Sequence, residues 1–263
     1  GGALRERGLR HRGWNGTRAP GGTDGLLSLE EVVELKNSPR MLVAERLVTD
    51  LVQAGLASGA PSRARDAARV LARWDRTADA TSRGGVLFKT WERLYRTAVD
   101  TASYWREPWT PERPMETPAG LGDPEAALEA LAAAADSMEA RGWALNVPWG
   151  EVHRVVRGEV DVPVSGCEGT LGCFRTLSFE EMEDGRWAAN RGDAWIFAVE
   201  FGDPPYGDPP RAYTVLAYGQ SPRVDSSHHA DQAEMFARGE MKAVAWTDEA
   251  IREGAIRRYR PGR

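Results

Sequence analysis

Six consecutive residues near the C-terminus carry the side chains best suited to chemistry, Ser226-Ser227-His228-His229-Ala230-Asp231. The two histidines and Asp231 could ligate a metal ion, and Ser226 could pair with His229 as nucleophile and base. Side chains this close along a chain seldom converge on one atom, because catalytic groups usually come from separate segments. We therefore favour a structural role, in which Asp225 or a serine caps a short helix and a histidine packs the turn against a sheet.

A second group of polar residues, Trp74-Asp75-Arg76 with Asp79, has the residue types needed for general acid–base catalysis. The plainer interpretation is the C-terminal end of a helix, held in place by packing of the tryptophan and by ion pairs. We favour this structural interpretation.

The two cysteines, Cys167 and Cys173, have five residues between them. This spacing does not match a zinc site, which normally needs four ligands. Two buried or free thiols are the plainer interpretation, and a local disulfide in an oxidising compartment is the alternative.

Composition and charge exclude several classes of function. The 263 residues are 41% apolar and carry 39 acids against 34 bases, a net charge of −5, which gives no reason to expect a nucleic-acid partner. No apolar run approaches the ~20 residues that span a bilayer, and the first residues lack the apolar segment of a signal peptide. The chain starts without Met in an arginine-rich stretch, which indicates a processed or truncated product. Walker, dinucleotide-binding and H-E-x-x-H motifs are absent from the sequence.

Helical signals dominate residues 28–142. Ser28 and Glu31 form a predicted capping box, and Pro39 is expected to end that helix near residue 37. Further helices are expected from residue 39, from Ser62 to about residue 75 and over 82–104, followed by an ordered loop over 105–122 that contains four prolines. Asp123-Pro124 then predicts the start of an alanine-rich helix that ends at Arg141-Gly142.

After Gly142 the apolar pattern becomes typical of strands, with predicted strands over 152–156 and 160–164. Residues 194–201 are almost entirely apolar, which predicts a strand buried on both faces, and 211–218 are its expected antiparallel neighbour. Ser178 to Glu181 match a capping box and predict a short helix or turn. Short helices are expected over 230–238 and 247–256.

This order of elements predicts an α+β protein in three regions. Residues 1–27 form a basic loop, 28–142 a helical region, and 143–263 an antiparallel β-rich region with C-terminal helices. Strands that are buried on both faces need covering layers, which either the helices or a partner chain could provide.

Four segments, in the same order, resemble the penicillin acylase family, a group of N-terminal nucleophile hydrolases that includes acyl-homoserine lactone acylases and lipopeptide deacylases. The first resembles the family pattern G-Q-S…S-P-H-Y-x-D-Q…F, with Ser227 in place of the usual Pro and His229 in place of the usual Tyr. It comprises Ala217-Tyr218-Gly219-Gln220-Ser221, then Ser227-His228-His229-Ala230-Asp231-Gln232 and Phe236. The other three are Leu29-Glu30-Glu31-Val32 with Ser38-Pro39-Arg40, then Trp74-Asp75-Arg76 with Ser82-Arg83-Gly84, and then Pro148-Trp149-Gly150-Glu151-Val152-His153-Arg154.

The resemblance implies that the chain is the C-terminal part of the β chain of an αββα hydrolase, with 1–27 a remnant of the nucleophile domain. Members of the family cut their own precursors. The first residue of the β chain, usually Ser, is the nucleophile, and its α-amino group is the base. A backbone N–H and an Asn side chain stabilise the oxyanion. By this comparison the nucleophile and the Asn lie upstream of Gly1, so the chain alone is expected to be inactive.

Arg5-Glu6-Arg7 with Leu9 is similar to an arginine motif that follows this Asn in the family. The resemblance implies a supporting role for Arg5 in organising the active site. Asn15 could substitute for the missing Asn, but Asn15-Gly16 is more typical of a turn.

The function implied by the resemblance is hydrolysis of linear amide C–N bonds in N-acylated small molecules, such as a β-lactam side chain, an acyl-homoserine lactone or a lipopeptide. The expected partners are this substrate and the remainder of the precursor, with no cofactor. A structural Ca²⁺ occurs in some relatives, and its ligands are expected outside this chain. The location is expected to be periplasmic or secreted. The alternatives are a non-catalytic interaction module or degenerate paralogue, and a self-contained hydrolase centred on Ser226–Asp231.

Overall fold

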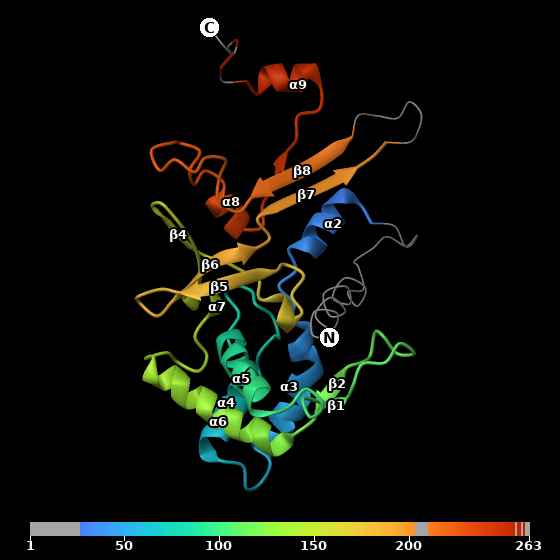
Figure 1. The fold of residues 1–263 in the computed structure, drawn as a ribbon, viewed down its shortest axis with the longest axis vertical. Helices are drawn as coiled ribbons and strands as arrows, with labels where there is room; N and C mark the ends of the chain where they lie inside the picture. Colours follow the sequence, from blue (N-terminus) through green and yellow to red (C-terminus); the bar gives the residue numbers. More distant parts are fainter. Residues whose placement is uncertain (1–26, 203–209, 256, 259, 261–263) are drawn as a thin grey trace.

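The structure is a computed structural model that describes residues 27–202, 210–255, 257–258 and 260. Helices gather at one end of the molecule, a mixed sheet lies across its middle, and a second sheet leads to the C-terminus (Figure 1). The predicted α+β class is confirmed. None of the described helices is long and apolar enough to cross a bilayer.

The predicted caps position the helices of the first half. The hydroxyl of Ser28 accepts a hydrogen bond from the backbone N–H of Glu31, whose carboxylate accepts one from the N–H of Ser28, as the capping box predicted. The carboxylate of Asp123 accepts a hydrogen bond from the backbone N–H of Ala126 and so caps the alanine-rich helix, without the reciprocal bond of a capping box. The helices are α2 (Leu29–Lys36), α3 (Leu42–Leu56), α4 (Ser62–Leu71), α5 (Gly85–Ala98) and α6 (Pro124–Ala140).

Helices α3 to α6 enclose the larger of two hydrophobic cores. Aromatic rings of α5 and the neighbouring segments form a row, in which each ring centroid lies 5.1–5.2 Å from the next, along Trp74, Phe88, Trp91, Tyr95 and Tyr104. Trp91 also donates a hydrogen bond to the carbonyl of Ala127, which joins α5 to α6. This row therefore fixes the helix that carries several residues of the candidate site.

Several boundaries differ from the sequence prediction. Pro61, rather than Ser62, occupies the N-cap position of α4, and the helix predicted over 82–104 is limited to α5. The predicted loop over 105–122 contains a small antiparallel pair, β1 (Trp105–Glu107) and β2 (Ala119–Leu121). A one-turn helix, α7 (Trp149–Val152), leads into the first strand of the mixed sheet.

The mixed sheet has the strand order β4–β3–β6–β5. Its β3–β4 and β5–β6 pairs are antiparallel, as predicted, whereas the β3–β6 pair is parallel. Residues 178–181, predicted to be a helix or turn, belong to β5 because they pair with β6. The strands are β3 (His153–Arg157), β4 (Val160–Pro163), β5 (Leu177–Glu181) and β6 (Trp187–Gly192).

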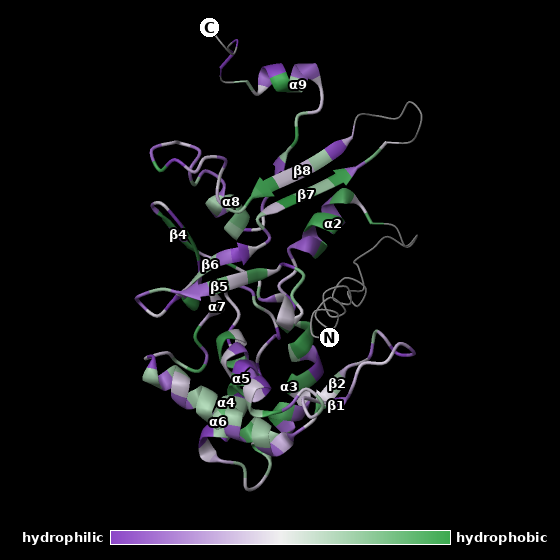
Figure 2. Ribbon diagram, in the orientation of Figure 1, coloured by the Kyte–Doolittle hydropathy of each residue, from purple (hydrophilic) through white to green (hydrophobic). Residues whose placement is uncertain are grey.

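The second sheet has the order β7–β8–β9, with β7 (Trp195–Glu200), β8 (Arg211–Leu216) and β9 (Lys242–Ala243). Strand β7 is coloured apolar along most of its length in Figure 2, as the sequence indicated. It is nevertheless buried on one face only. Ile196 is 5% exposed and packs with the short helix α8 (Ala233–Ala237), whereas Trp195 is 65% and Phe197 41% exposed. The described residues therefore supply only one of the two covering layers that the prediction requires, and a partner chain is the other source that the sequence allowed. The last helix is α9 (Asp248–Glu253).

Candidate functional site

The predicted Ser226–Asp231 site does not assemble. His228 Nδ1 lies 2.8 Å from Asp231 Oδ2 on the surface, whereas His229 is buried, with its Nδ1 3.2 Å from the carbonyl of Ser221. The hydroxyl of Ser226 accepts a hydrogen bond from the backbone N–H of His228 and is not paired with His229. Within the described ranges, no three His, Cys, Asp or Glu side chains converge on a metal position. The segment is structural, as the favoured interpretation had it, but the predicted cap is wrong: the N-cap of α8 is Gln232 and makes no side-chain capping bond, and Asp225 pairs with Arg223.

The group around Asp75 is also structural. Its carboxylate accepts hydrogen bonds from the hydroxyls of Thr77 and Ser82, and Trp74 Nε1 donates to the same Ser82 hydroxyl. Asp79 accepts hydrogen bonds from Thr81 and from the hydroxyl of Ser165. These contacts close the turn after α4 and tie it to the segment that follows β4, so both carboxylates have structural partners.

Arg5, predicted to support catalysis, and Asn15 lie outside the described residues.

Cys167 and Cys173 form a disulfide, so the favoured interpretation of two thiols was wrong. The loop between them turns at Gly172, which has a φ of +82° and lies against α3, where an added Cβ would meet Leu42 Cβ at 2.6 Å. Glycine is favoured at such a position. The turn brings the two cysteine Cα atoms to 5.5 Å, within the range that a disulfide spans.

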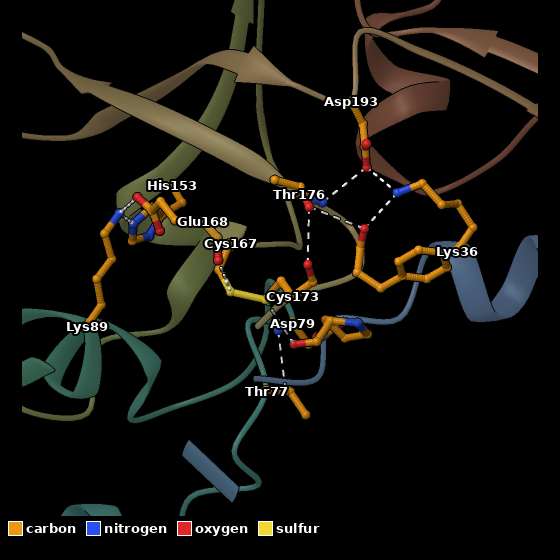
Figure 3. Close-up of a disulfide and its surroundings, with 12 residues drawn as sticks. Lys36, Thr77, Asp79, Lys89, His153, Cys167, Glu168, Cys173, Thr176 and Asp193 are labelled. Carbon is orange, nitrogen blue, oxygen red and sulfur yellow. Dashed lines mark hydrogen bonds and ion pairs between the residues drawn. A yellow bond between two sulfur atoms is a disulfide. The ribbon is translucent and has the colours of Figure 1, made fainter. Parts of the chain in front are cut away.

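The disulfide loop carries Glu168 to a buried cluster with Lys89 of α5 and His153 of β3 (Figure 3). Lys89 Nζ lies 2.7 Å from Glu168 Oε1 and 3.0 Å from His153 Nε2. His153 stacks on Trp149 with ring centroids 3.6 Å apart, and its Nδ1 lies 3.2 Å from the Trp149 carbonyl. A carbonyl can only accept, so Nδ1 carries the proton and Nε2 accepts from Lys89.

The environment of this cluster is largely aromatic. Lys89 Nζ lies 4.7 Å from the ring centre of Phe179 and 4.8 Å from that of Trp187, distances typical of cation–π contacts. Burial lowers the pKa of Lys89, although the charge of Glu168 opposes this effect. Burial, and then the charge of Lys89, hold the pKa of His153 well below its ordinary value of 6.5. Among the described residues the cluster is therefore a neutral imidazole beside an ion pair, which can bind polar groups but offers no activated nucleophile.

On the other side of the disulfide, Lys36 ties α2 to the same loop. Its ammonium forms an ion pair with Asp193 and donates a 2.7 Å hydrogen bond to the carbonyl of Phe174. Asp193 also accepts a hydrogen bond from the backbone N–H of Thr176 (Figure 3). The loop that carries Glu168 is thus held from both ends.

A cavity of about 250 Å³ opens beside the Lys89 cluster, between α5, α6 and the disulfide loop. Sequence reasoning did not identify this site, because Lys89 and His153 are 64 residues apart in the chain. The sequence held one signal for this site, which was His153. It lies in the Pro148–Arg154 motif, which we used only as part of the family resemblance.

The low pKa of His153 predicts a loss of stability in mild acid. Below about pH 6.5, His153 is protonated in the unfolded chain but stays neutral in the folded chain. Because the unfolded state then binds more protons, the free energy of unfolding decreases as the pH falls. Above pH 6.5 this loss is absent. Below pH 6.5 the free energy of unfolding decreases by up to about 1.4 kcal/mol per pH unit, until the pKa of His153 in the folded chain is reached. Lys89 faces the ring through its contact with Nε2, and Glu168 in turn pairs with Lys89.

Urea denaturation of the protein at pH 7.5 and pH 5.5 measures this loss, and His153→Gln is the matched variant. The variant is expected to be less stable at both values but to show a smaller difference between them. An equal difference in variant and wild type would contradict the assignment of the titration to His153.

Comparisons with known proteins were made for the whole chain. A model of the family described as penicillin amidase matches residues 7–253. The acyl-homoserine lactone acylase PvdQ of Pseudomonas syringae pv. syringae (strain B728a) is 26% identical over 241 residues, which cover 88% of this chain and 30% of that protein. The aculeacin-A acylase of Actinoplanes utahensis is 29% identical over 245 residues, which cover 88% of this chain and 29% of that protein.

One solved structure is similar over most of the chain. A thermostable penicillin G acylase from Alcaligenes faecalis gives a TM-score of 0.46 at 19% identity, over 89% of this chain and 49% of that chain. The chain spans about 30% of the length of the curated relatives that it matches.

Proposed function

The chain belongs to the penicillin amidase family, and we infer that it is part of an acylase that hydrolyses the amide bond of N-acylated small molecules. The observation that carries this proposal is the family match over residues 7–253, which includes all four motif segments. The named activities of the relatives, acyl-homoserine lactone acylase and aculeacin-A acylase, support a substrate with an acyl group on nitrogen.

In the proposed reaction, a nucleophile at the start of the β chain attacks the acyl carbonyl and expels the amine, and water then hydrolyses the acyl-enzyme. The nucleophile and the oxyanion Asn are assigned to a part of the protein upstream of this chain. Arg5 supports that site from within the chain. The described residues are consistent with this division, since they offer no competing pair of hydroxyl and imidazole.

The proposed partner is the remainder of the same precursor. Strand β7 supports this, because it lies at the edge of its sheet and the described residues leave Trp195 and Phe197 exposed on one face. Adjacent exposed aromatic side chains are typical of a surface that another part of a protein covers. The chain is proposed to add helices and sheet strands to the complete fold.

Acyl transfer of this kind needs no cofactor, and none is proposed. The ligands of any structural Ca²⁺ are proposed to lie outside this chain. A periplasmic or secreted location is proposed. The Cys167–Cys173 disulfide supports it, because disulfides persist in oxidising compartments.

The complete protein is expected to release p-nitroaniline from an N-acyl p-nitroanilide, and the 263-residue chain alone is expected to release none above background. Replacing the first residue of the β chain with alanine should abolish turnover by the complete protein, because both the nucleophile and the base reside there. Initial rates with fatty-acyl and phenylacetyl anilides measure the activity and rank the acyl groups.

Turnover by the isolated chain would contradict the proposal. His229→Ala in the complete protein is the control, and it is expected to lower stability while kcat is retained. A complete protein that folds but hydrolyses no acyl anilide would indicate the alternative, a degenerate paralogue or interaction module.

A further inference from the structure

The cavity beside Lys89 has an excess of positive charge. Helix α5 places Lys89, Arg93 and Arg96 on one face, because positions four and three residues apart lie above one another on a helix. Arg141, just after α6, supplies a fourth cation, against the carboxylates of Glu92 and Glu168. Like charges on successive turns are unfavourable, so this arrangement is unusual for a purely structural surface.

Two of the arginines are already paired and one is not. Arg96 lies 3.2 Å from Glu92, and Arg141 lies 2.5 Å from Glu181. In the part of the chain that the structure describes, the exposed guanidinium of Arg93 has no direct ion pair and no side-chain hydrogen bond, although its charge acts on Glu181, the partner of Arg141. Arg93 is therefore available to bind an anion at the cavity mouth.

The inner end of the cavity has the opposite polarity. Glu168 Oε1 forms an ion pair with Lys89, but Glu168 Oε2 is buried and has no hydrogen-bond donor among the described residues. A buried carboxylate oxygen without a donor costs about 1–3 kcal/mol, or more when it is charged. A molecule in the cavity that donates a hydrogen bond would remove this cost.

Apolar side chains line the space between the two ends, including Val86, Met138, Trp143 and Trp187. The volume of about 250 Å³ lies just below the range of sites for drug-sized ligands. A fragment-sized molecule with a flat apolar body matches this lining. Its two ends are expected to differ chemically, because Arg93 offers a cation without a direct ion pair and Glu168 Oε2 offers an acceptor without a donor.

We propose that this cavity binds a small amphipathic carboxylate, with the carboxylate on Arg93, the apolar body between Trp143 and Trp187, and a hydroxyl or N–H donor on Glu168. The disulfide loop and Lys89 fix the position of Glu168.

Isothermal titration calorimetry on the complete protein, with its nucleophile replaced by alanine, tests this proposal. The probe is 4-hydroxyphenylacetate, which has a phenol donor, a ring and a carboxylate. Phenylacetate lacks the donor and 4-hydroxyphenylethanol lacks the carboxylate, and each is expected to bind about tenfold more weakly. Arg93→Ala is expected to weaken binding of the two carboxylates about tenfold and to leave 4-hydroxyphenylethanol unchanged.

Arg73→Ala, an exposed arginine outside the cavity, is the matched control and should leave all three affinities unchanged. Carboxylate binding that is insensitive to Arg93→Ala, as expected for occupation of the acyl pocket alone, would overturn the proposal. Absence of binding, or an experimental structure of the complete protein in which another segment fills the cavity, would overturn it as well.

Discussion

Replacing Trp91 with alanine is expected to destabilise the helical region by about 3–5 kcal/mol, the cost of removing a large aromatic side chain from a closed core. Trp91 is fully buried and lies between Phe88 and Tyr95, each with its ring centroid 5.2 Å away. The substitution also leaves the carbonyl of Ala127 without its 3.0 Å hydrogen bond from the indole, which loosens α6 from α5.

Hydrogen exchange of the backbone amides of α5 and α6 measures this loss locally and does not depend on two-state unfolding of a large protein. Trp91→Phe should recover part of the stability because it keeps most of the ring contacts. Trp246→Ala, which removes a tryptophan that is 45% exposed, is the control and should cost far less. Equal effects of the two alanine variants would contradict the prediction.

Replacing Lys89 with methionine is expected to cost about 2–4 kcal/mol, because it removes one partner of a mostly buried ion pair. The side chains of Lys89 and Glu168 are 18% and 24% exposed, so water screens the remaining charge only in part. The substitution would leave both oxygens of Glu168 and Nε2 of His153 without donors. The cost comes from these orphaned acceptors rather than from lost attraction alone.

A double variant, Lys89→Met with Glu168→Gln, separates the two causes. It should be more stable than Lys89→Met, since a neutral amide is less costly to bury than an unpaired carboxylate. Urea denaturation of the wild type, both single variants and the double variant gives the free energies of unfolding for this double-mutant cycle. The surface variant Lys242→Met is the control and should change the free energy of unfolding by no more than about 0.5 kcal/mol. A double variant less stable than Lys89→Met would show that the orphaned charge is not the cause.

Local signals in the sequence predicted local structure well. The caps at Ser28 and Asp123 depend on side chains and N–H groups three residues apart, and both form as expected. Residues 178–181 carry the same capping pattern, yet they lie in β5 because pairing with β6 outweighs it. Pairing between segments depends on the rest of the fold, which the pattern S-x-x-E does not encode.

The candidate cavity could not be predicted for a related reason. Its charged residues come from α5, from β3 and from the disulfide loop, and their meeting depends on how those three elements pack. The disulfide depends in turn on the tight turn at Gly172 against α3. Only the family resemblance reached beyond the chain's own local patterns, and it placed the chemistry outside the described residues.

The position of strand β7 at the edge of its sheet has a consequence for the behaviour of the chain in solution. The exposed rings of Trp195 and Phe197 on this edge strand offer an apolar surface to another copy of the chain. The 263-residue chain expressed alone is therefore expected to self-associate in concentrated solution. In the proposed precursor, the flanking polypeptide would cover these rings before two copies can meet.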